Sequence, residues 1–163
     1  MQVTLKGQPL ELEGNQPVTG EKAVNFSLVD LNDSTVELSD LLAKPLVISV
    51  VPDIDTSVCA IQTKRFNQEA ASMEEINFVT ISNNSKEQQS NWCAAEGVDM
   101  MMLRDTDLAF GKGYGLYIPE INHLARAIFV INQEGVVAYE EIVPEIAQEP
   151  DYTKAIEAAK TLI

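Results

Sequence analysis

The most apolar stretch of the chain is also the most informative about its fold. Residues 45–51 read Pro-Leu-Val-Ile-Ser-Val-Val, a run of the length expected for a strand that is covered on both faces. Pro52 cannot donate a hydrogen bond to a sheet and is expected to end this strand. Thr56 or Ser57 can then cap a helix whose first turn carries Cys59. The pattern therefore predicts an interior strand followed at once by a helix that begins with a cysteine.

Alternating and helical patterns on either side of this stretch predict the remaining elements. Apolar residues alternate around the turn at residues 6–9, and Gly135 lies between two apolar runs, which is typical of β-hairpins. Residues 83–85 offer cap chemistry, and Gly97 is a typical residue at the end of a helix. The predicted elements are hairpins at 2–13, 26–38 and 124–143, strands at 76–82 and 100–103, helices beginning near Ser39 or Asp40, at 83–85, near Asp105 or Thr106 and at 149–151, and a flexible glycine-rich segment at 111–115.

The order of these elements predicts an α/β fold. Strands that alternate with helices favour a mainly parallel sheet covered on both sides, here finished by an antiparallel pair. In the first long helix, Val58, Phe66 and Met73 have the spacing of a face packed against that sheet. Residues 1–163 are expected to form a single domain, because this length buries enough surface without disulfides. The order resembles a thioredoxin-like fold with a central mixed sheet flanked by helices and an N-terminal β-hairpin extension.

Composition and charge narrow the function. The chain carries 25 acidic and 11 basic residues, and its formal net charge of −14 would repel nucleic acid and anionic membranes. Its amino terminus lacks the basic and apolar segments of a signal peptide, and no apolar run has the length of a spanning helix, so we expect a cytoplasmic protein. Two cysteines and one histidine make a poor zinc set, which leaves Cys59 and Cys93 either catalytic or inert.

Cys59 is the first candidate for chemistry. Unpaired N–H groups at a helix N-terminus favour a thiolate over a thiol. The position three before it is Thr56, so a local Cys-x-x-Cys disulfide is excluded and the thiol needs either a base or a distant second thiol. A cysteine hydrolase would have to use His123, the single histidine, for which the sequence favours a surface or structural role. The alternative is that Cys59 is a small buried hydrophobe.

Several motifs together resemble one family. Pro52, Thr56 and Cys59 match the peroxiredoxin signature P-x-x-x-[T/S]-x-x-C, placed after an apolar strand. Further runs resemble the thiol peroxidase branch, the atypical 2-Cys peroxiredoxins. These runs lie at 55–60, 92–97, 124–130 and 149–152, so the resemblance covers nearly the whole chain.

The resemblance implies a role for four of these residues. Cys59 would be the peroxidatic cysteine, which attacks a peroxide as a thiolate and becomes a sulfenic acid. Arg126 would hold the thiolate and a peroxide oxygen together; the alternative is an ordinary salt-bridging arginine, although an unpaired charge in its apolar run would be costly. Thr56 would position the peroxide in addition to capping the helix. Pro52 would shield the thiolate from water in addition to ending the strand.

Cys93 is the second candidate, and its role is open from the sequence alone. It stands beside Trp92 in the next predicted helix and could equally be a packed residue. The resemblance implies that it is the resolving cysteine, which would form an intramolecular disulfide with Cys59 that thioredoxin then reduces. Bridging would require local unwinding, because cysteines on different helices need not lie within about 7 Å of each other.

The favoured hypothesis is a thioredoxin-dependent thiol peroxidase that reduces hydrogen peroxide and organic hydroperoxides. The resemblance implies that it needs no metal, haem or flavin and that it forms a homodimer. Two other classes of protein would use the same residues differently. One is a peroxide sensor, in which the disulfide changes a binding surface, and the other is a non-catalytic thioredoxin-fold binding module.

Overall fold

The computed structural model describes all of residues 1–163. Its elements are β1 (Gln2–Leu5), β2 (Gln8–Glu11), β3 (Ser27–Asp30), β4 (Thr35–Glu37), the 3-10 helix η1 (Leu38–Leu41), β5 (Leu46–Val50), α1 (Ser57–Ser72), β6 (Asn77–Ser82), α2 (Lys86–Glu96), β7 (Met101–Arg104), α3 (Ala109–Gly113), β8 (Tyr117–Ile118), β9 (His123–Leu124), β10 (Ala127–Ile131), β11 (Val137–Ile142) and α4 (Tyr152–Lys160). They follow the predicted order with two exceptions: α3 begins at Ala109 and not near Asp105 or Thr106, and the short β8–β9 hairpin is not among the predicted elements.

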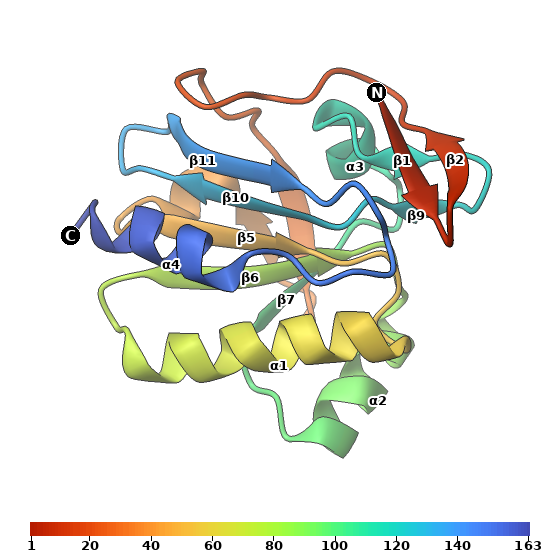
Figure 1. Ribbon diagram of the computed structural model, residues 1–163. Helices are drawn as coiled ribbons and strands as arrows, with labels where there is room; N and C mark the ends of the chain where they lie inside the picture. Colours follow the sequence, from red (N-terminus) through yellow and green to blue (C-terminus); the bar gives the residue numbers. More distant parts are fainter.

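A seven-stranded sheet in the order β11-β10-β5-β6-β7-β3-β4 forms the centre of the molecule (Figure 1). The apolar run of the sequence becomes β5, which lies between β10 and β6 with every residue buried, as predicted. The sheet is mixed, since only the β5–β6 and β6–β7 pairs are parallel. The expectation of a mainly parallel sheet is therefore wrong, because the hairpins β3–β4 and β10–β11 join its two edges in antiparallel register.

Different layers cover the two faces of the sheet. One face carries Val47 and Ile128, which pack with residues of α1 and α4 in one apolar cluster. The other face carries Ile48 and Phe129, which pack with η1, α3 and the β1–β2 hairpin. Figure 1 shows α1 and α4 on one side of the sheet and α3, β1 and β2 away from them. The second face is thus covered by short elements, whereas the long helices lie on the first.

Local sequence signals set the ends of the later helices. Ser85 caps α2 by accepting a hydrogen bond from the backbone N–H of Gln88 (3.2 Å). Gly97 ends the same helix in the left-handed conformation, with φ of 68°, which glycine adopts without steric cost. Asp151 caps α4 through the N–H of Lys154 (3.1 Å). The capping signals of the sequence therefore place the start of both helices and the end of α2 correctly.

The glycine-rich segment 111–115 is not the flexible segment that we expected. Its first three residues belong to α3, whose start is held by the Asp105 carboxylate through the N–H groups of Phe110 (2.9 Å) and Gly111 (2.8 Å). Burial raises the pKa of the Asp105 carboxyl to about 6. A Cβ at Gly111 would lie 2.3 Å from the Leu124 side chain. The glycine is therefore needed for close packing, and the prediction of flexibility is wrong.

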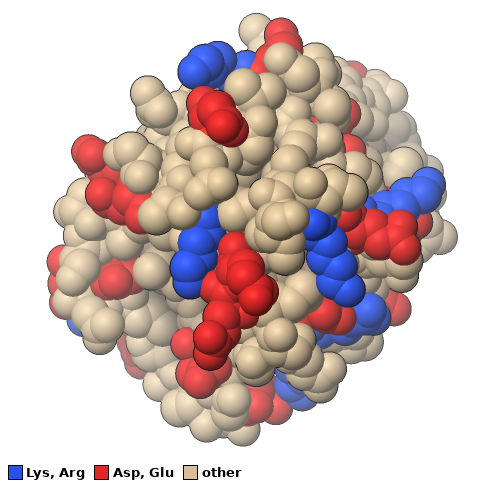
Figure 2. Space-filling model, turned by 90° about the vertical axis from the view of Figure 1, so that its left-hand side faces the viewer, with Lys and Arg blue, Asp and Glu red and all other residues tan.

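The surface bears both acidic and basic side chains. Figure 2 shows the side of the molecule that lies at the left in Figure 1, where acidic and basic side chains are interspersed and the basic ones form no continuous patch. That face therefore lacks the positive surface that nucleic-acid binding requires. The longest helix, α1, has 16 residues, and none of the helices combines the length and apolar character needed to cross a bilayer.

Candidate active site

Cys59 lies where the sequence predicts it, in the first turn of α1 behind the end of β5. The residue is fully buried. Two donors contact its sulfur: Nη2 of Arg126 at 3.4 Å and the backbone N of Asp53 at 3.5 Å. A cation and a backbone dipole therefore meet at one sulfur atom, where they can stabilise negative charge.

Arg126 comes from the segment between β9 and β10 and is only 2% exposed. Its guanidinium donates to the carbonyl of Ile146 (Nε, 2.9 Å), to Oε1 of Gln62 (Nη1, 2.9 Å) and to the sulfur of Cys59. None of the ion pairs includes Arg126, so the alternative of an ordinary salt-bridging arginine is wrong. A buried cation is costly without an anionic partner. Among the groups that it contacts, the Cys59 sulfur is the one that can become negative.

Gln62 is a site residue that sequence reasoning missed. It is fully buried, accepts the hydrogen bond from Arg126, and donates from Nε2 to the hydroxyl of Ser49 on β5 (2.8 Å). The sequence does hold a signal for it, because Cys59, Gln62 and Phe66 are spaced to share one helix face. A glutamine on a buried face needs polar partners. Gln62 thus fixes the orientation of the guanidinium beside the sulfur.

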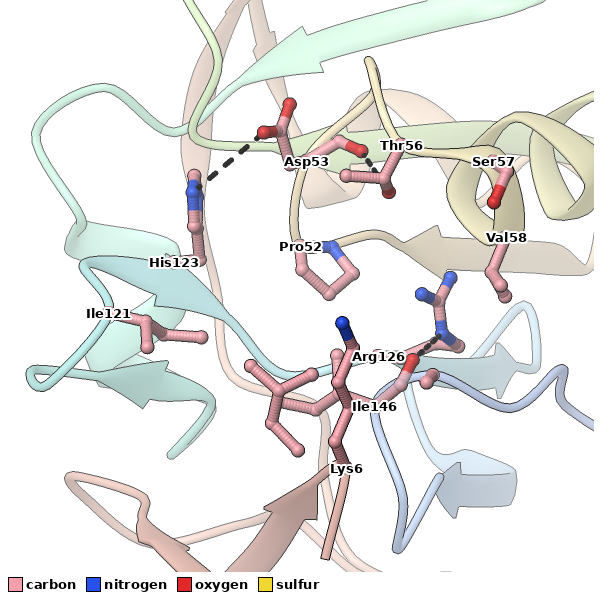
Figure 3. A pocket seen from close by; sticks show the side chains of 12 residues that line it. Lys6, Pro52, Asp53, Thr56, Ser57, Val58, Ile121, His123, Arg126 and Ile146 are labelled. Atoms are coloured by element: carbon pink, nitrogen blue, oxygen red, sulfur yellow. Dashed lines mark hydrogen bonds and ion pairs between the residues drawn. The ribbon is translucent and has the colours of Figure 1, made fainter. Parts of the chain in front are cut away.

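Arg126 faces a pocket of about 430 Å³ that Pro52 and Thr56 also line (Figure 3). Pro52 is buried between the end of β5 and the pocket, and Thr56 lies at the helix start with its side chain exposed. Two lining residues, Arg126 and Asp53, contact the Cys59 sulfur. The structure therefore brings four of the five candidate residues together, in a site with one open side.

Thr56 occupies the N-cap position of α1, but its hydroxyl does not cap the helix. The backbone is extended, as at an N-cap, yet the hydroxyl donates to the carbonyl of Asp53 at 2.8 Å. The expected capping bond is therefore absent, because the hydroxyl is placed to donate to the Asp53 carbonyl of the tight turn at residues 53–56 and does not accept from a helix N–H. The hydrogen of this hydroxyl is thereby committed, while its lone pairs remain free to accept a hydrogen bond from a molecule in the pocket.

His123, for which the sequence favours a surface or structural role, lines the same pocket. Its Nε2 lies 4.0 Å from the carboxylate of Asp53, and its Nδ1 lies 3.1 Å from Oδ1 of Asn83. Figure 3 shows it on the opposite side of Pro52 from Arg126. The imidazole is thus engaged with Asp53 and Asn83, so the structure offers no Cys-His pair for a hydrolase.

Cys93 does not meet Cys59 in this structure. Both cysteines are free thiols, and Cys93 is half-buried near the end of α2. There it lines a separate hollow of about 340 Å³ with Leu31 and Met100 among its neighbours. Burial raises the pKa of the Cys93 thiol. In this state Cys93 is therefore protonated at neutral pH, and a disulfide with Cys59 requires movement.

A buried asparagine connects the Cys59 loop to the beginning of the Cys93 helix. Asn84 is 4% exposed, and its Oδ1 accepts from the N–H of Ile54 (2.9 Å). Its Nδ2 donates to the carboxylate of Asp53 (3.1 Å) and to the side chain of Gln88 in α2 (3.3 Å). Displacing either cysteine-bearing segment therefore strains the same set of hydrogen bonds.

Fold and site together define a class of protein. The fold is α/β, with a mixed central sheet and a hairpin extension. One cysteine lies at a helix N-terminus, and the sulfur of this cysteine is contacted by a buried arginine that lacks a carboxylate partner. This combination is that of a thiol-based redox protein with a thioredoxin-like fold.

Comparisons with known proteins identify the family. A family model described as Redoxin matches residues 18–156. A thiol peroxidase from Halalkalibacterium halodurans is 46% identical over 163 residues, which cover 99% of this chain and 98% of that protein. A thiol peroxidase from Bacillus subtilis is 42% identical over 164 residues, with the same coverage of 99% and 98%. The crystal structure of a peroxiredoxin-like protein from Aquifex aeolicus matches with a TM-score of 0.93 at 32% identity, covering 99% of this chain and 97% of that one. The chain therefore belongs to the redoxin family and, within it, to the thiol peroxidases.

Proposed function

We propose that this protein reduces hydrogen peroxide and organic hydroperoxides through Cys59, with thioredoxin as the reductant. The observation that carries the proposal is the 3.4 Å contact between Nη2 of Arg126 and the Cys59 sulfur beneath an open pocket. A guanidinium held there can stabilise charge both on the attacking sulfur and on the leaving oxygen.

The first half of the reaction takes place at Cys59. Its thiolate attacks the terminal oxygen of the hydroperoxide, and an S–O bond forms as the O–O bond breaks. Cys59 is oxidised by two electrons to a sulfenic acid, while the leaving alkoxide takes up a proton and becomes an alcohol. Because the cysteine has no exposed surface, peroxide reaches the sulfur only when the pocket lining shifts. Pro52 keeps bulk water from the sulfur until then.

Replacing Thr56 by valine is expected to lower kcat/KM for hydrogen peroxide about tenfold to a hundredfold, because the acceptor that would hold the peroxide O–H is lost. Serine at the same position keeps the hydroxyl and should stay within a few-fold of the wild type. Stopped-flow measurement of peroxide reduction compares the two variants. If Thr56→Val and Thr56→Ser had equal rates, the hydroxyl would have no part in positioning the peroxide.

Replacing Gln62 by leucine is expected to lower the same kcat/KM about tenfold to a hundredfold, because Nη1 of Arg126 loses its acceptor and the guanidinium can turn away from the sulfur. The unpaired buried N–H should also lower the free energy of unfolding by about 1–3 kcal/mol. Urea unfolding measures the second effect. Gln68→Leu, on the exposed side of the same helix, is the matched control and should change neither quantity. Wild-type kcat/KM in Gln62→Leu would contradict this role.

Cys93 completes the cycle in this proposal. Its thiol condenses with the Cys59 sulfenic acid, water leaves, and a disulfide forms; two electrons and two protons from the dithiol of thioredoxin then restore both thiols. The first turn of α1, the end of α2 or both must unwind for the sulfurs to meet. A movement of the Cys59 loop relative to the beginning of α2 would break the bonds of Asn84. Unwinding also exposes Cys93 to water, which removes the cause of its raised pKa.

We further propose that the protein forms one domain, is a homodimer and is located in the cytoplasm. The redoxin match and the single seven-stranded sheet support treating residues 1–163 as one domain. The resemblance to the thiol peroxidases supports a homodimer. A cytoplasmic location fits the reducing partner that the cycle needs.

Repeated turnover separates this function from its alternatives. With thioredoxin, thioredoxin reductase and NADPH, the wild-type protein should consume many equivalents of hydrogen peroxide per Cys59. A peroxide sensor would stop after about one equivalent and recover slowly. A non-catalytic binding module would show no oxygen addition at Cys59 by mass spectrometry after stoichiometric peroxide. Either of these results would overturn the proposal.

A further inference from the structure

The pocket beside Cys59 is larger than hydrogen peroxide. Its volume is about 430 Å³, whereas hydrogen peroxide takes roughly twice the ~30 Å³ of a water molecule. Apolar side chains line much of it, among them Leu5, Val58, Ile121 and Ile146. The site therefore has room for the organic part of a larger hydroperoxide.

Besides Arg126, the pocket is lined by a lysine side chain, that of Lys6. It lies in the turn between β1 and β2, and Figure 3 shows its side chain extending past Ile146 with the ammonium directed toward Pro52. No carboxylate lies within the 4.0 Å of an ion pair from this ammonium. Its charge is therefore available to an anion in the pocket.

Glu145 fixes the turn that carries Lys6. Its carboxylate accepts from the backbone N–H groups of Gly7 (3.0 Å) and Ala147 (2.8 Å) and from the hydroxyl of Thr4 (3.0 Å). The hydrogen bonds, first of all the one from Ala147, lower the pKa of Glu145 to about 2. The carboxylate is thus charged at neutral pH, and the turn is held by several bonds at once.

The strand before the Lys6 turn is also linked to Arg126 by hydrogen bonds. The backbone of Thr4 accepts from the N–H of Ile146 (2.8 Å), and the carbonyl of Ile146 accepts from Nε of Arg126 (2.9 Å). Lys6 and Arg126 are therefore carried by one hydrogen-bonded frame, although 120 positions of sequence separate them.

The acidic groups near the pocket are engaged with other partners and do not pair with Lys6. Asp53 is bonded to Asn84 and to the N–H of Asp55, and Figure 3 places it beside His123, across Pro52 from Lys6. The Glu145 carboxylate is occupied by the donors of the turn. The Lys6 ammonium thus has no carboxylate partner, although the negative charge of Glu145 remains on the turn that carries it.

We propose that Lys6 binds a carboxylate at the far end of the substrate, so that the site prefers hydroperoxides with an apolar body and an acidic end. The inference rests on the proposed peroxidase function. In this arrangement the O–O group lies at Arg126, the apolar body lies along Leu5 and Ile146, and the carboxylate meets the Lys6 ammonium.

A matched pair of substrates tests this. Cumene hydroperoxide carrying a para-carboxylate is compared with the para-carboxamide, which has nearly the same size without the charge. In the wild-type protein at low salt, KM for the carboxylate should be about threefold to fivefold lower, the range of a solvent-accessible ion pair. Lys6→Gln should remove this ratio and Lys6→Glu should invert it. Lys160→Gln, which changes net charge equally on exposed α4 surface, should keep the wild-type ratio.

The outcomes separate the substrate preference from the peroxidase function. Equal KM values for the two substrates in the wild type, or an unchanged ratio in Lys6→Gln, would overturn the role of Lys6. A wild-type protein that fails to turn over hydrogen peroxide would instead overturn the proposed function. Thermal unfolding midpoints of the Lys6 variants close to the wild type exclude loss of the hairpin as the cause of a changed ratio.

Discussion

Cys59→Ser is expected to abolish peroxide reduction. The value of kcat/KM should fall by about 10⁴-fold or more, the scale of removing a catalytic nucleophile. The serine hydroxyl stays protonated at neutral pH, even with a guanidinium beside it, and an alcohol attacks an O–O bond far more slowly than a thiolate does. Peroxide consumption in the thioredoxin-coupled assay, together with single-turnover measurements without thioredoxin, reports the loss.

The fold should tolerate this substitution. Serine is close to cysteine in size, and its oxygen can accept the hydrogen bonds that Arg126 and the Asp53 backbone donate to the sulfur. An unchanged circular dichroism spectrum is the control. Peroxide reduction by Cys59→Ser at a few per cent of the wild-type rate would mean that another group attacks the peroxide.

Cys93→Ser should separate the two halves of the cycle. Cys59 should still be oxidised, consuming about one equivalent of hydrogen peroxide per chain, because Arg126, Gln62 and Thr56 lie together without any contact to Cys93. Steady-state turnover with thioredoxin should be lost, since the sulfenic acid has no partner thiol. Trapping with dimedone and mass spectrometry identifies the sulfenic acid, and excess peroxide should carry it on to the sulfinic acid.

Full thioredoxin-dependent turnover in Cys93→Ser would remove the intramolecular disulfide from the mechanism. The wild-type protein offers a second measurement. Hydrogen exchange around residues 56–62 and 88–97 should be faster in the disulfide form than in the reduced form, because the helix ends must unwind to bring the sulfurs together. Identical protection in the two redox states would contradict the movement that the separate positions of Cys59 and Cys93 require.

Much of the site can be read from residues that are close in the chain. The β-branched run becomes β5, Pro52 follows its end, and Cys59 falls in the first turn of the next helix. Ser85 and Gly97 likewise bound the helix of Cys93. These features depend on backbone propensities and on hydrogen bonds over three or four positions, which is the range in which a sequence pattern carries physical information.

Local reasoning fails where two partners compete for the same group. The Thr56 hydroxyl can satisfy a helix N–H or the carbonyl of Asp53, and the turn geometry favours the carbonyl. A glycine in the segment 111–115 can make the backbone flexible or let another side chain pack closely against it. Gly111 does the second, because the Leu124 side chain occupies the space that a Cβ would need. The sequence is compatible with both outcomes in each case, because the choice depends on atoms that only folding brings near.

By itself, the sequence determines most of the elements, the helix-start position of Cys59 and, through its motifs, the family. Tertiary structure decides which distant groups meet there. Arg126 contacts a sulfur 67 positions away and is oriented there by Gln62, and the pocket gains Lys6 and His123 from two separate hairpins. The direction of these side chains follows from how the hairpins pack on the sheet. Packing depends on contacts over the whole chain, so no local pattern records it.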